Sequence, residues 1–367
     1  MRIGIDARPL KSKEYSGIPK VVCEVIRRWN ESNHEDKFYL ISNTDIELPF
    51  ELSDNWEKII VPAYTGNGTL WHIFRLGGII KKLKLDSFWG TNYLLPLKVN
   101  NCRYLLTVHD LAFEIMPCVV SKKTFIILKA LCRRSCDRAD VIHTISESTK
   151  NDIINYYKID SNKICVQYLG VDTLDNDIVQ QASHKEIPNF KFILVLGTIE
   201  PRKNIETIIK AFNSFKEKDD NEIHIVFAGK MGWKYQNFIK LVRDSKYVDY
   251  IHIWQYVDDA TKEMLLNNAE ILLFPSLYEG FGLPVLEAFQ HHLLVVTAEN
   301  SSLPEVAGNG AIFVKNPLDY IELSEVLEEV FDIDTIEKEQ YIKNGEHHLK
   351  KFSWEKCAQG ILEMLKA

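Results

Sequence analysis

The sequence predicts an α/β protein with two doubly wound domains, each built around a parallel sheet. Its 367 residues exceed what one ordinary hydrophobic core organises, and this length favours two domains. Short apolar runs alternate with helical patterns through both halves of the chain, as in repeated β-α units. A polar stretch without a sustained period, residues 172–189, separates the halves. We therefore expect two Rossmann-like domains that face each other across a cleft.

The predicted strands are apolar runs of the length that buried parallel strands have. In the first half they are Arg2–Asp6, Phe38–Ser42, Lys58–Val61, Asp86–Trp89, Tyr104–Val108, Val141–Ile145 and Ile164–Tyr168. In the second half they are Phe192–Thr198, Ile223–Ala228, Tyr250–Tyr256, Ile271–Pro275, Leu293–Thr297 and Ala311–Val314. Because ligands bind beyond the carboxyl ends of parallel strands, the residues that directly follow these runs are the candidates for a site.

The domain boundaries follow from the same pattern. We place an N-terminal domain in residues 1–175, a linker in 176–190, a C-terminal domain in 191–350 and a terminal helix in 351–367. The terminal segment is predicted as an amphipathic helix because Ile361, Leu362 and Leu365 fall on one face.

The composition is that of an ordinary globular protein. With 46% hydrophobic residues, 26% charged residues and a formal charge of −7, it argues against a nucleic-acid partner. No apolar run approaches the length that spans a bilayer, and no apolar region follows a basic leader at the start. We expect a cytoplasmic location.

The cysteines and the common cofactor motifs exclude several classes. Seven cysteines are scattered without C-x-x-C spacing, which favours reduced structural thiols. Cys132 and Cys136 are one helical turn apart, but no nearby Cys or His pair completes a zinc site. Neither the dinucleotide-binding G-x-G-x-x-G nor the phosphate-binding G-x-x-x-x-G-K-[ST] follows a predicted strand, which argues against a dehydrogenase and a P-loop kinase.

Two carboxylates flank a predicted loop-to-helix junction in the second half. Glu279 precedes Gly280 and Gly282, which suit a tight turn, and Glu287 follows Pro284, which suits the first turn of a helix. The unpaired N–H groups of a helix N-terminus attract phosphate and other polar oxygens. In the alternative interpretation, the glycines only shape the connection and Glu287 complements the helix dipole.

Polar residues follow two other predicted strands. Arg202 and Lys203 come shortly after the run Phe192–Thr198, where adjacent cations are placed to neutralise a diphosphate. In the first half, His109 and Asp110 follow Tyr104–Val108 directly. Taken alone, the cations are also consistent with a solvated basic loop, and the histidine with a packed residue.

These segments together resemble a known enzyme family. The run from Glu279 to Glu287, with Gly-Phe-Gly-Leu-Pro between the acids, resembles the E-x7-E signature of retaining glycosyltransferases with the GT-B architecture, specifically glycosyltransferase family 4. Gly197–Asn204 resembles the family's G-x-x-x-P-R-K-N segment, and Val108–Leu111 its segment beside the donor sugar. Some members carry an Arg where this chain has Thr198, so one phosphate contact is missing or supplied differently. The resemblance spans nearly the whole chain.

The resemblance implies roles for particular residues. Glu279, His109 and Asp110 are the implied catalytic residues beside the transferred sugar and the acceptor. The implied donor-binding residues are Gly17, Arg202, Lys203, Tyr256, Val257, Phe281, Gly282, Leu283 and Glu287. In this set Arg202 and Lys203 hold the diphosphate in place of a metal, and Glu287 binds the ribose hydroxyls. The terminal helix is implied to cross back onto the N-terminal domain, which is the implied acceptor-binding domain.

The implied activity is metal-independent, retaining transfer of a hexosyl or deoxyhexosyl group from a nucleotide diphosphate sugar, without a further cofactor. His109-Asp110-Leu111 resembles mannosyl- and rhamnosyl-transferring relatives, so GDP-mannose is the expected donor. The expected acceptor is a lipid-linked or polysaccharide glycan of a bacterial surface. Asp175-x-Asp177 and Asp332-x-Asp334 have the letters of a metal motif, but we interpret both as solvent-facing.

Other functions of the same architecture stay open. A nucleotide-sugar epimerase and a phosphorylase use the same fold, and a non-catalytic sugar-binding subunit would retain the same residues. Conversion of the donor sugar without acceptor would indicate the epimerase, and dependence on phosphate would indicate the phosphorylase.

A basic face is predicted on the helix over residues 121–137. Lys122, Lys129 and Arg133 share it, and Arg134 lies close by. Neighbouring apolar residues are Phe125, Ile127, Leu128 and Leu131. The helix is consistent with a peripheral contact to an anionic membrane or a lipid diphosphate, and equally with a core-facing helix whose basic side is solvated.

Overall fold

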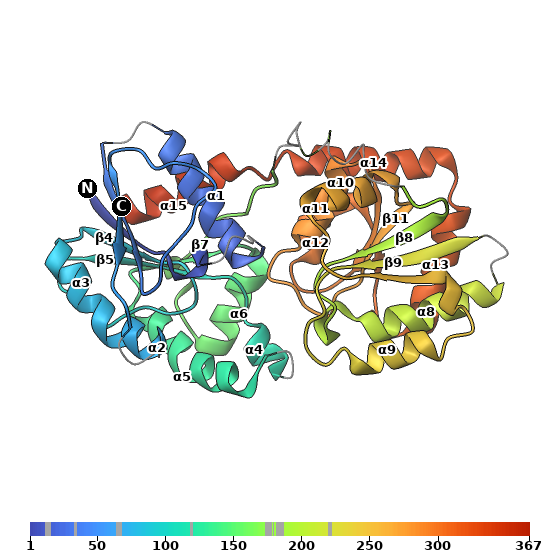
Figure 1. Ribbon diagram of the computed structural model, residues 1–367, viewed down its shortest axis with the longest axis horizontal. Helices are drawn as coiled ribbons and strands as arrows, with labels where there is room; N and C mark the ends of the chain where they lie inside the picture. Colours follow the sequence, from blue (N-terminus) through green and yellow to red (C-terminus); the bar gives the residue numbers. More distant parts are fainter. Residues whose placement is uncertain are drawn as a thin grey trace. The chain divides into compact units, whose positions relative to one another are not determined.

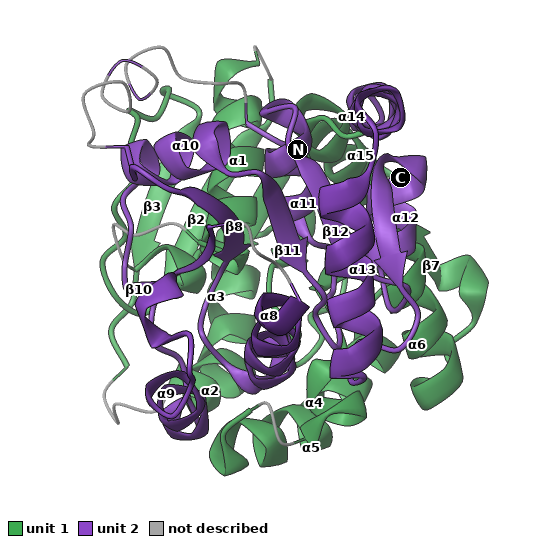
Figure 2. Cartoon of the chain, turned by 90° about the vertical axis from the view of Figure 1, so that its right-hand side faces the viewer, with its two compact units in different colours: residues 1–170, 352–367 green, residues 171–351 purple. Residues whose placement is uncertain are grey.

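The computed structural model describes residues 1–11, 16–32, 35–63, 68–117, 120–172, 178, 180, 187–218 and 222–367. The chain forms two compact units, Met1–Gly170 with Phe352–Ala367, and Val171–Lys351 (Figure 2). Most of the predicted linker, residues 176–190, lies outside the described residues, as do Cys118, Asp175 and Asp177. Each unit contains one parallel sheet with helices on both faces, which confirms the predicted α/β class.

The sheet of the first unit has seven described strands, all parallel, in the order β3-β2-β1-β4-β5-β6-β7. The strands are β1 (Arg2–Asp6), β2 (Lys37–Ser42), β3 (Trp56–Ile60), β4 (Ser87–Gly90), β5 (Arg103–Val108), β6 (Val141–Thr144) and β7 (Ile164–Val166). Each lies where the sequence predicts it, with ends displaced by at most two residues. Strands β1, β4 and β5 are almost completely buried, as expected for strands covered on both faces.

Helices cover both faces of this sheet (Figure 1). They are η1 (Arg8–Leu10), α1 (Ile18–Glu31), α2 (Gly68–Leu70), η2 (Trp71–Arg75), α3 (Leu76–Leu83), α4 (Ala112–Ile115), α5 (Lys122–Arg138), α6 (Glu147–Tyr157), η4 (Ser161–Lys163) and α15 (Trp354–Lys366). Helices α1 and α15 cover one face, and α3 and α5 cover the other. The core on the second face gathers large side chains such as Phe88, Tyr104 and Phe113.

The second unit has a six-stranded parallel sheet in its described residues, in the order β10-β9-β8-β11-β12-β13. Its strands are β8 (Lys191–Leu196), β9 (Ile223–Ala228), β10 (Ile251–Trp254), β11 (Ile271–Phe274), β12 (Leu294–Ala298) and β13 (Ala311–Val314). Its helices are η5 (Pro201–Lys203), α8 (Ile205–Lys218), α9 (Gln236–Arg243), η6 (Val248–Tyr250), α10 (Asp259–Asn268), α11 (Leu283–Gln290), α12 (Leu303–Ala307), η7 (Gly308–Gly310), α13 (Tyr320–Asp332) and α14 (Thr335–Leu349). The main core lies between the sheet and α8, α9 and α13.

The strand order places a topological switch point in each sheet. In the first unit, β1 lies between β2 and β4, so the chain leaves β1 toward one side of the sheet and β4 toward the other. In the second unit β8 has the same position between β9 and β11. Connections that diverge in this way leave a crevice beyond the carboxyl ends of the two central strands. The segments after β8 and β11 are those that carry Arg202, Lys203 and Glu279.

Helix α15 completes the first unit although it comes last in the chain. The Trp29 indole N–H donates to Ala358 O at 2.8 Å, and the Ser87 hydroxyl donates to Leu365 O at 2.7 Å. At the start of the helix, Gly170 lies directly against Trp354. A Cβ atom added to Gly170 would lie 2.1 Å from the Trp354 backbone nitrogen. Only glycine fits there, because backbone atoms cannot move aside as a flexible side chain can.

This contact predicts the effect of one methyl group. We expect Gly170→Ala to lower the free energy of unfolding of the first unit by about 2 kcal/mol or more, since the new Cβ forces the two backbone segments apart. Thermal unfolding and urea titration measure the change. Gly78→Ala is the matched control, because its Cβ would meet no atom within 4 Å on helix α3, and alanine is the better helix former. Equal stability of the two variants would contradict the packing argument.

Candidate functional site

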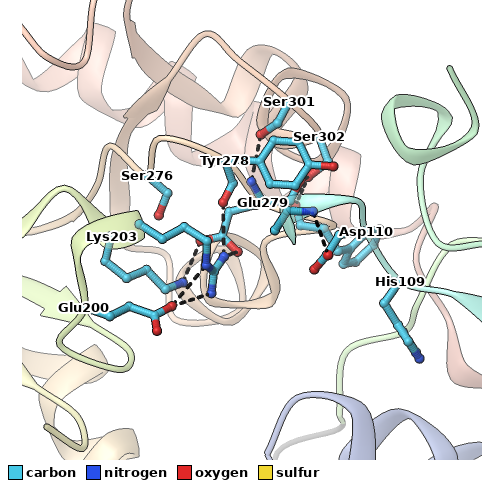
Figure 3. Close-up of polar contacts among 12 residues, drawn as sticks. His109, Asp110, Glu200, Lys203, Ser276, Tyr278, Glu279, Ser301 and Ser302 are labelled. Carbon is cyan, nitrogen blue, oxygen red and sulfur yellow. Dashed lines mark hydrogen bonds and ion pairs between the residues drawn. The ribbon is translucent and has the colours of Figure 1, made fainter. Parts of the chain in front are cut away.

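Three charged side chains meet beyond the ends of β8 and β11. Glu279 accepts from Arg202 Nη1 at 2.6 Å through Oε2 and from Lys203 Nζ at 2.7 Å through Oε1 (Figure 3). The Lys203 ammonium also lies 4.2 Å from the centre of the Phe274 ring, at the end of β11. We call Arg202, Lys203 and Glu279 the charged clamp. It joins two segments that are more than 70 residues apart in the sequence.

The electrostatics of the clamp follow from its burial. Burial alone raises the pKa of Glu279, but the charges of Arg202 and Lys203 outweigh it and lower that pKa to about 2. Burial likewise lowers the pKa of Lys203, and the Glu279 charge offsets this only in part. Glu279 is therefore a carboxylate at neutral pH, and its two oxygens are occupied by strong charge-assisted donors.

A second carboxylate, that of Glu200, lies on the opposite side of the Arg202 guanidinium. Glu200 Oε1 accepts from Arg202 Nε at 3.0 Å and from Nη2 at 2.9 Å. Arg202 Nη1 also donates to Tyr278 O at 3.1 Å. The guanidinium is therefore held on two edges, with its plane fixed by carboxylates from both loops.

Left-handed glycines allow the two loops to pass this close. Gly197, directly after β8, has φ +127°, and a Cβ there would lie 3.3 Å from Lys203 Cε. Gly282 has φ +116° and is the N-cap of α11. Pro284 has no N–H group, and the Val285 N–H donates to Gly282 O at 3.0 Å, so the first turn of α11 closes directly on its glycine cap. Phe281, directly before this cap, is buried.

The connection between β12 and α12 braces the loop that carries Glu279. The Ser302 hydroxyl lies 3.0 Å from Glu279 O and 2.7 Å from Phe281 O. The Glu279 N–H donates to Ser301 Oγ at 3.0 Å (Figure 3). Asn300 Nδ2 donates to Ser276 O at 3.1 Å. Side chains from a third segment thus fix the backbone on both sides of the carboxylate.

In the first unit, His109 and Asp110 are held by the segment that follows β4. His109 Nε2 lies 2.9 Å from Thr91 O. The Tyr93 hydroxyl donates to Asp110 Oδ1 at 2.9 Å, and the Ala112 N–H donates to the same oxygen at 3.0 Å. Tyr93 has φ +57°, which is uncommon for a bulky residue, and its ring meets the His109 ring edge-on at 6.0 Å. Backbone strain of this kind is often found at functional sites.

These contacts define the chemical state of His109. Burial lowers its pKa, and the hydrogen bond to Thr91 O and the Asp110 charge oppose this shift. A backbone carbonyl only accepts, so Nε2 carries the proton and Nδ1 carries the lone pair in the neutral ring. At neutral pH, His109 is therefore suited to accept a hydrogen bond at Nδ1 from a hydroxyl group.

The remaining predicted donor-binding residues lie at separate places in their units. Glu287, in the second turn of α11, accepts from Lys262 Nζ at 3.0 Å rather than joining the charged clamp. Tyr256 and the half-buried Val257 follow β10, and Tyr256 is 59% exposed with Lys230 Nζ 4.7 Å from its ring centre. In the first unit, Gly17 has φ +59° and is the N-cap of α1.

Comparison with known proteins gives the family. The model "Glycosyl transferases group 1" matches residues 177–348, and the model "Glycosyltransferase Family 4" matches residues 15–174. The O-antigen chain mannosyltransferase RfbU of Salmonella typhimurium is 30% identical over 308 residues, which are 84% of this chain and 80% of that protein. The chain belongs to glycosyltransferase family 4.

Two further proteins are similar to this family 4 glycosyltransferase. The O-antigen chain mannosyltransferase B of Escherichia coli is 26% identical over 318 residues, which are 84% of this chain and 81% of the relative. WaaG, a glycosyltransferase involved in lipopolysaccharide biosynthesis, superimposes with a TM-score of 0.72 at 16% identity, covering both chains completely. The structural similarity confirms the GT-B fold that the resemblance implied.

The basic helix of this family 4 glycosyltransferase is α5, and most of its large apolar residues face the protein. Phe125 and Leu128 pack against the core of the first unit, and Ile127 and Leu131 are half-buried. Lys122 and Arg133 are exposed, whereas Lys129 forms an ion pair with Glu114 of α4. The exposed apolar residue on the helix is Ile126, at 65%. The geometry thus matches a core-facing helix with a solvated basic side.

The remaining sequence features of the family 4 glycosyltransferase are two aspartates and the cysteines. Asp332 and Asp334 are exposed, and Asp334 caps α14 by accepting from the Glu337 N–H. The cysteines that the structure describes are free thiols, and Cys132 and Cys136 are buried. Within the described ranges, no three His, Cys, Asp or Glu side chains gather as a metal ion would need. Among the described helices, none combines the length and apolarity needed to cross a bilayer.

Sequence reasoning missed the residues that hold the predicted ones in place. Glu200 lies inside the Gly197–Asn204 segment, but no pattern distinguished it from a solvated acid. Tyr93, Ser301 and Ser302 lie outside the segments to which the sequence assigns a role. Their signal in the sequence was only their position directly after β4 and β12, where polar side chains reach the same edge of the sheet.

The Tyr93 hydroxyl predicts a kinetic effect. Tyr93→Phe removes the bond to Asp110 and leaves the Ala112 N–H as the described donor to Oδ1, so Asp110 should be less well oriented. We expect kcat for glycosyl transfer to fall about tenfold with a thermal midpoint close to that of the wild type. Steady-state kinetics and thermal unfolding measure both. Tyr156→Phe, on the exposed side of α6, is the control, and equal kcat in the two variants would contradict the role of Tyr93.

Proposed function

We propose that the protein transfers a mannosyl group, with retention of configuration, from GDP-mannose to a lipid-linked or polysaccharide acceptor in bacterial surface glycan synthesis. The observation that carries this proposal is the pair of adjacent, half-buried cations in the charged clamp, at the switch point of the second unit. The sugar and the acceptor class are supported by the two relatives, both named as O-antigen mannosyltransferases.

The proposed chemistry depends on stabilising a diphosphate leaving group. The bond between the anomeric carbon and the donor phosphate breaks, and the acceptor oxygen forms its bond on the same face of the sugar. The acceptor proton moves to an oxygen of the leaving phosphate. Arg202 and Lys203 supply fixed positive charge for the negative charge that develops, which makes a metal ion unnecessary in this proposal.

Glu279 is assigned a positioning role beside the transferred sugar rather than the role of a nucleophile. Its carboxylate accepts from Arg202 and Lys203 at 2.6 and 2.7 Å, which reduces its basicity and nucleophilicity. The pKa of about 2 expresses the same stabilisation of the anion. Retention without an enzymatic nucleophile then favours same-face displacement, in which positioning and charge stabilisation supply the rate.

The other residues take the roles that the family suggests. His109 would accept a hydrogen bond from a donor-sugar hydroxyl at Nδ1, and Asp110 would orient the acceptor or its neighbours. Glu287 would bind the ribose hydroxyls, exchanging its bond to Lys262 for them. The Tyr256–Val257 segment would contact the base. The first unit would bind the acceptor, and the exposed Lys122 and Arg133 of α5 would attract its anionic lipid diphosphate or membrane.

The proposal predicts the behaviour of Glu279→Gln. With GDP-mannose and a lipid-linked acceptor, transfer should fall at least about a hundredfold while the protein stays folded, because the amide cannot pair with both cations. Calorimetry should show GDP binding largely kept. Product analysis by NMR gives the anomeric configuration, and turnover that survives in EDTA tests metal independence. Normal turnover of the variant would remove Glu279 from the mechanism.

The same assay separates the alternatives. Conversion of the donor sugar without acceptor would indicate an epimerase, and a requirement for inorganic phosphate would indicate a phosphorylase. Donor binding without turnover on a panel of GDP-, UDP- and dTDP-sugars would indicate a sugar-binding subunit. Turnover with another donor of the panel would correct the base or the sugar and keep the reaction class.

The proposed membrane contact has its own test. We expect the double variant Lys122→Glu with Arg133→Glu to lose co-sedimentation with anionic liposomes, since both side chains are exposed and each change reverses a charge. Lys343→Glu with Lys350→Glu in the second unit is a control of equal charge change. Unchanged binding of the α5 variant to anionic vesicles would exclude α5 as the contact.

A further inference from the structure

The charged clamp and its neighbour Glu200 together carry no net charge. Arg202 and Lys203 contribute two positive charges, and Glu200 and Glu279 contribute two negative ones. A neutral cluster has little attraction for a diphosphate, although its two cations are the groups that suit one. A diphosphate therefore experiences the full attraction of the two cations only if one of the two carboxylates moves away from them.

The two carboxylates are held very differently. Glu279 is 9% exposed at its side chain, receives donors from two cations, and lies on a backbone braced by Ser301 and Ser302. Glu200 is 17% exposed, and a single oxygen, Oε1, spans the Nε and Nη2 groups of Arg202. Moving the Glu200 carboxylate from Arg202 into solvent costs less free energy than moving the Glu279 carboxylate from its partners, because the charge of Glu200 is less desolvated.

The place that Glu200 takes on Arg202 matches a phosphate. The Nε–Nη2 edge of a guanidinium donates two parallel N–H groups, which is the geometry in which arginine binds phosphate oxygens. The third nitrogen, Nη1, stays with Glu279 and Tyr278 O. The guanidinium plane is thus already fixed before a ligand arrives, with one edge covered by the more exposed Glu200 and the third nitrogen held by the more buried Glu279.

We propose that Glu200 is an exchangeable counter-ion that the donor diphosphate displaces from the Nε–Nη2 edge of Arg202. This inference rests on the proposed function, since it requires a diphosphate ligand in the second unit. Glu200 keeps Arg202 oriented in the free enzyme and competes with the diphosphate for the same edge. Its return to Arg202 favours release of the nucleoside diphosphate product.

The inference predicts that removing the Glu200 charge strengthens binding. Calorimetry with GDP, UDP and dTDP is carried out on the wild type and on Glu200→Gln, which keeps the size of the side chain. For the nucleoside diphosphate that the wild type binds, we expect a Kd about fivefold lower in Glu200→Gln, from the loss of one repulsive charge at contact distance. The matching nucleoside, which has no phosphate, should bind both proteins equally. In turnover, slower product release should lower kcat together with KM.

Control variants keep the result interpretable. Glu217→Gln removes an exposed carboxylate of α8 that pairs with Lys246, and its Kd should equal that of the wild type. Glu200→Asp keeps the charge and should not bind more tightly than the wild type. Glu200→Ala repeats the test if the glutamine variant does not fold, as judged by thermal unfolding.

Each outcome decides the question. A Kd of Glu200→Gln that is unchanged or higher, with normal binding by the wild type, overturns the exchange and makes Glu200 a permanent orienting partner of Arg202. A lower Kd for the nucleoside as well as the diphosphate also overturns it, since the gain would not come from phosphate. If the wild type binds none of the three nucleoside diphosphates, the proposed function itself fails.

Discussion

The ion pairs that Glu279 makes with Arg202 and Lys203 are the constraint on which the second unit's site depends. Removing Glu279 would leave Arg202 and Lys203 without their shared carboxylate, and removing either cation would leave one oxygen of the buried Glu279 without its charged donor. The loop after β8 and the loop after β11 are therefore fixed by each other rather than by their own sequences. Ser301 and Ser302 extend this dependence to a third loop, so the site behaves as one electrostatic assembly on three strand ends.

The fold was predictable because buried parallel strands appear in the sequence as continuous apolar runs. Such runs can be recognised without knowing which distant residues are in contact. Their ends were less certain, for reasons visible at particular residues. The run predicted as Phe192–Thr198 ends at Leu196 in β8, because Gly197 turns the chain with φ +127°. The run predicted as Tyr250–Tyr256 ends at Trp254, where the carbonyl accepts from the Gly229 N–H. The hydrophobicity pattern of a sequence does not reveal local backbone geometry of this kind.

The site was predictable only where chemistry and position coincide in one segment. Arg202, Lys203 and His109 follow apolar strands, and resemblance to a family gave them roles. Their mutual contacts were not predictable, since the bond from Arg202 to Glu279 joins residues far apart in sequence. The same limit applies to Tyr93, whose strained backbone and bond to Asp110 depend on the β4 and β5 ends lying side by side. On α5, the sequence periodicity predicted a basic face and neighbouring apolar residues. It could not show that Phe125 and Leu128 face the core.

The return of α15 to the first unit has a consequence for biosynthesis. Strands β4 and β5 pack against α15, and the Trp29 indole and Ser87 hydroxyl find their acceptors there. Trp29 precedes its acceptor by 329 residues and Ser87 by 278 residues in the order of synthesis. In a nascent chain the second unit, Val171–Lys351, can fold while the first unit still exposes the apolar surface that α15 covers. The unit made first on the ribosome is thus the one completed last.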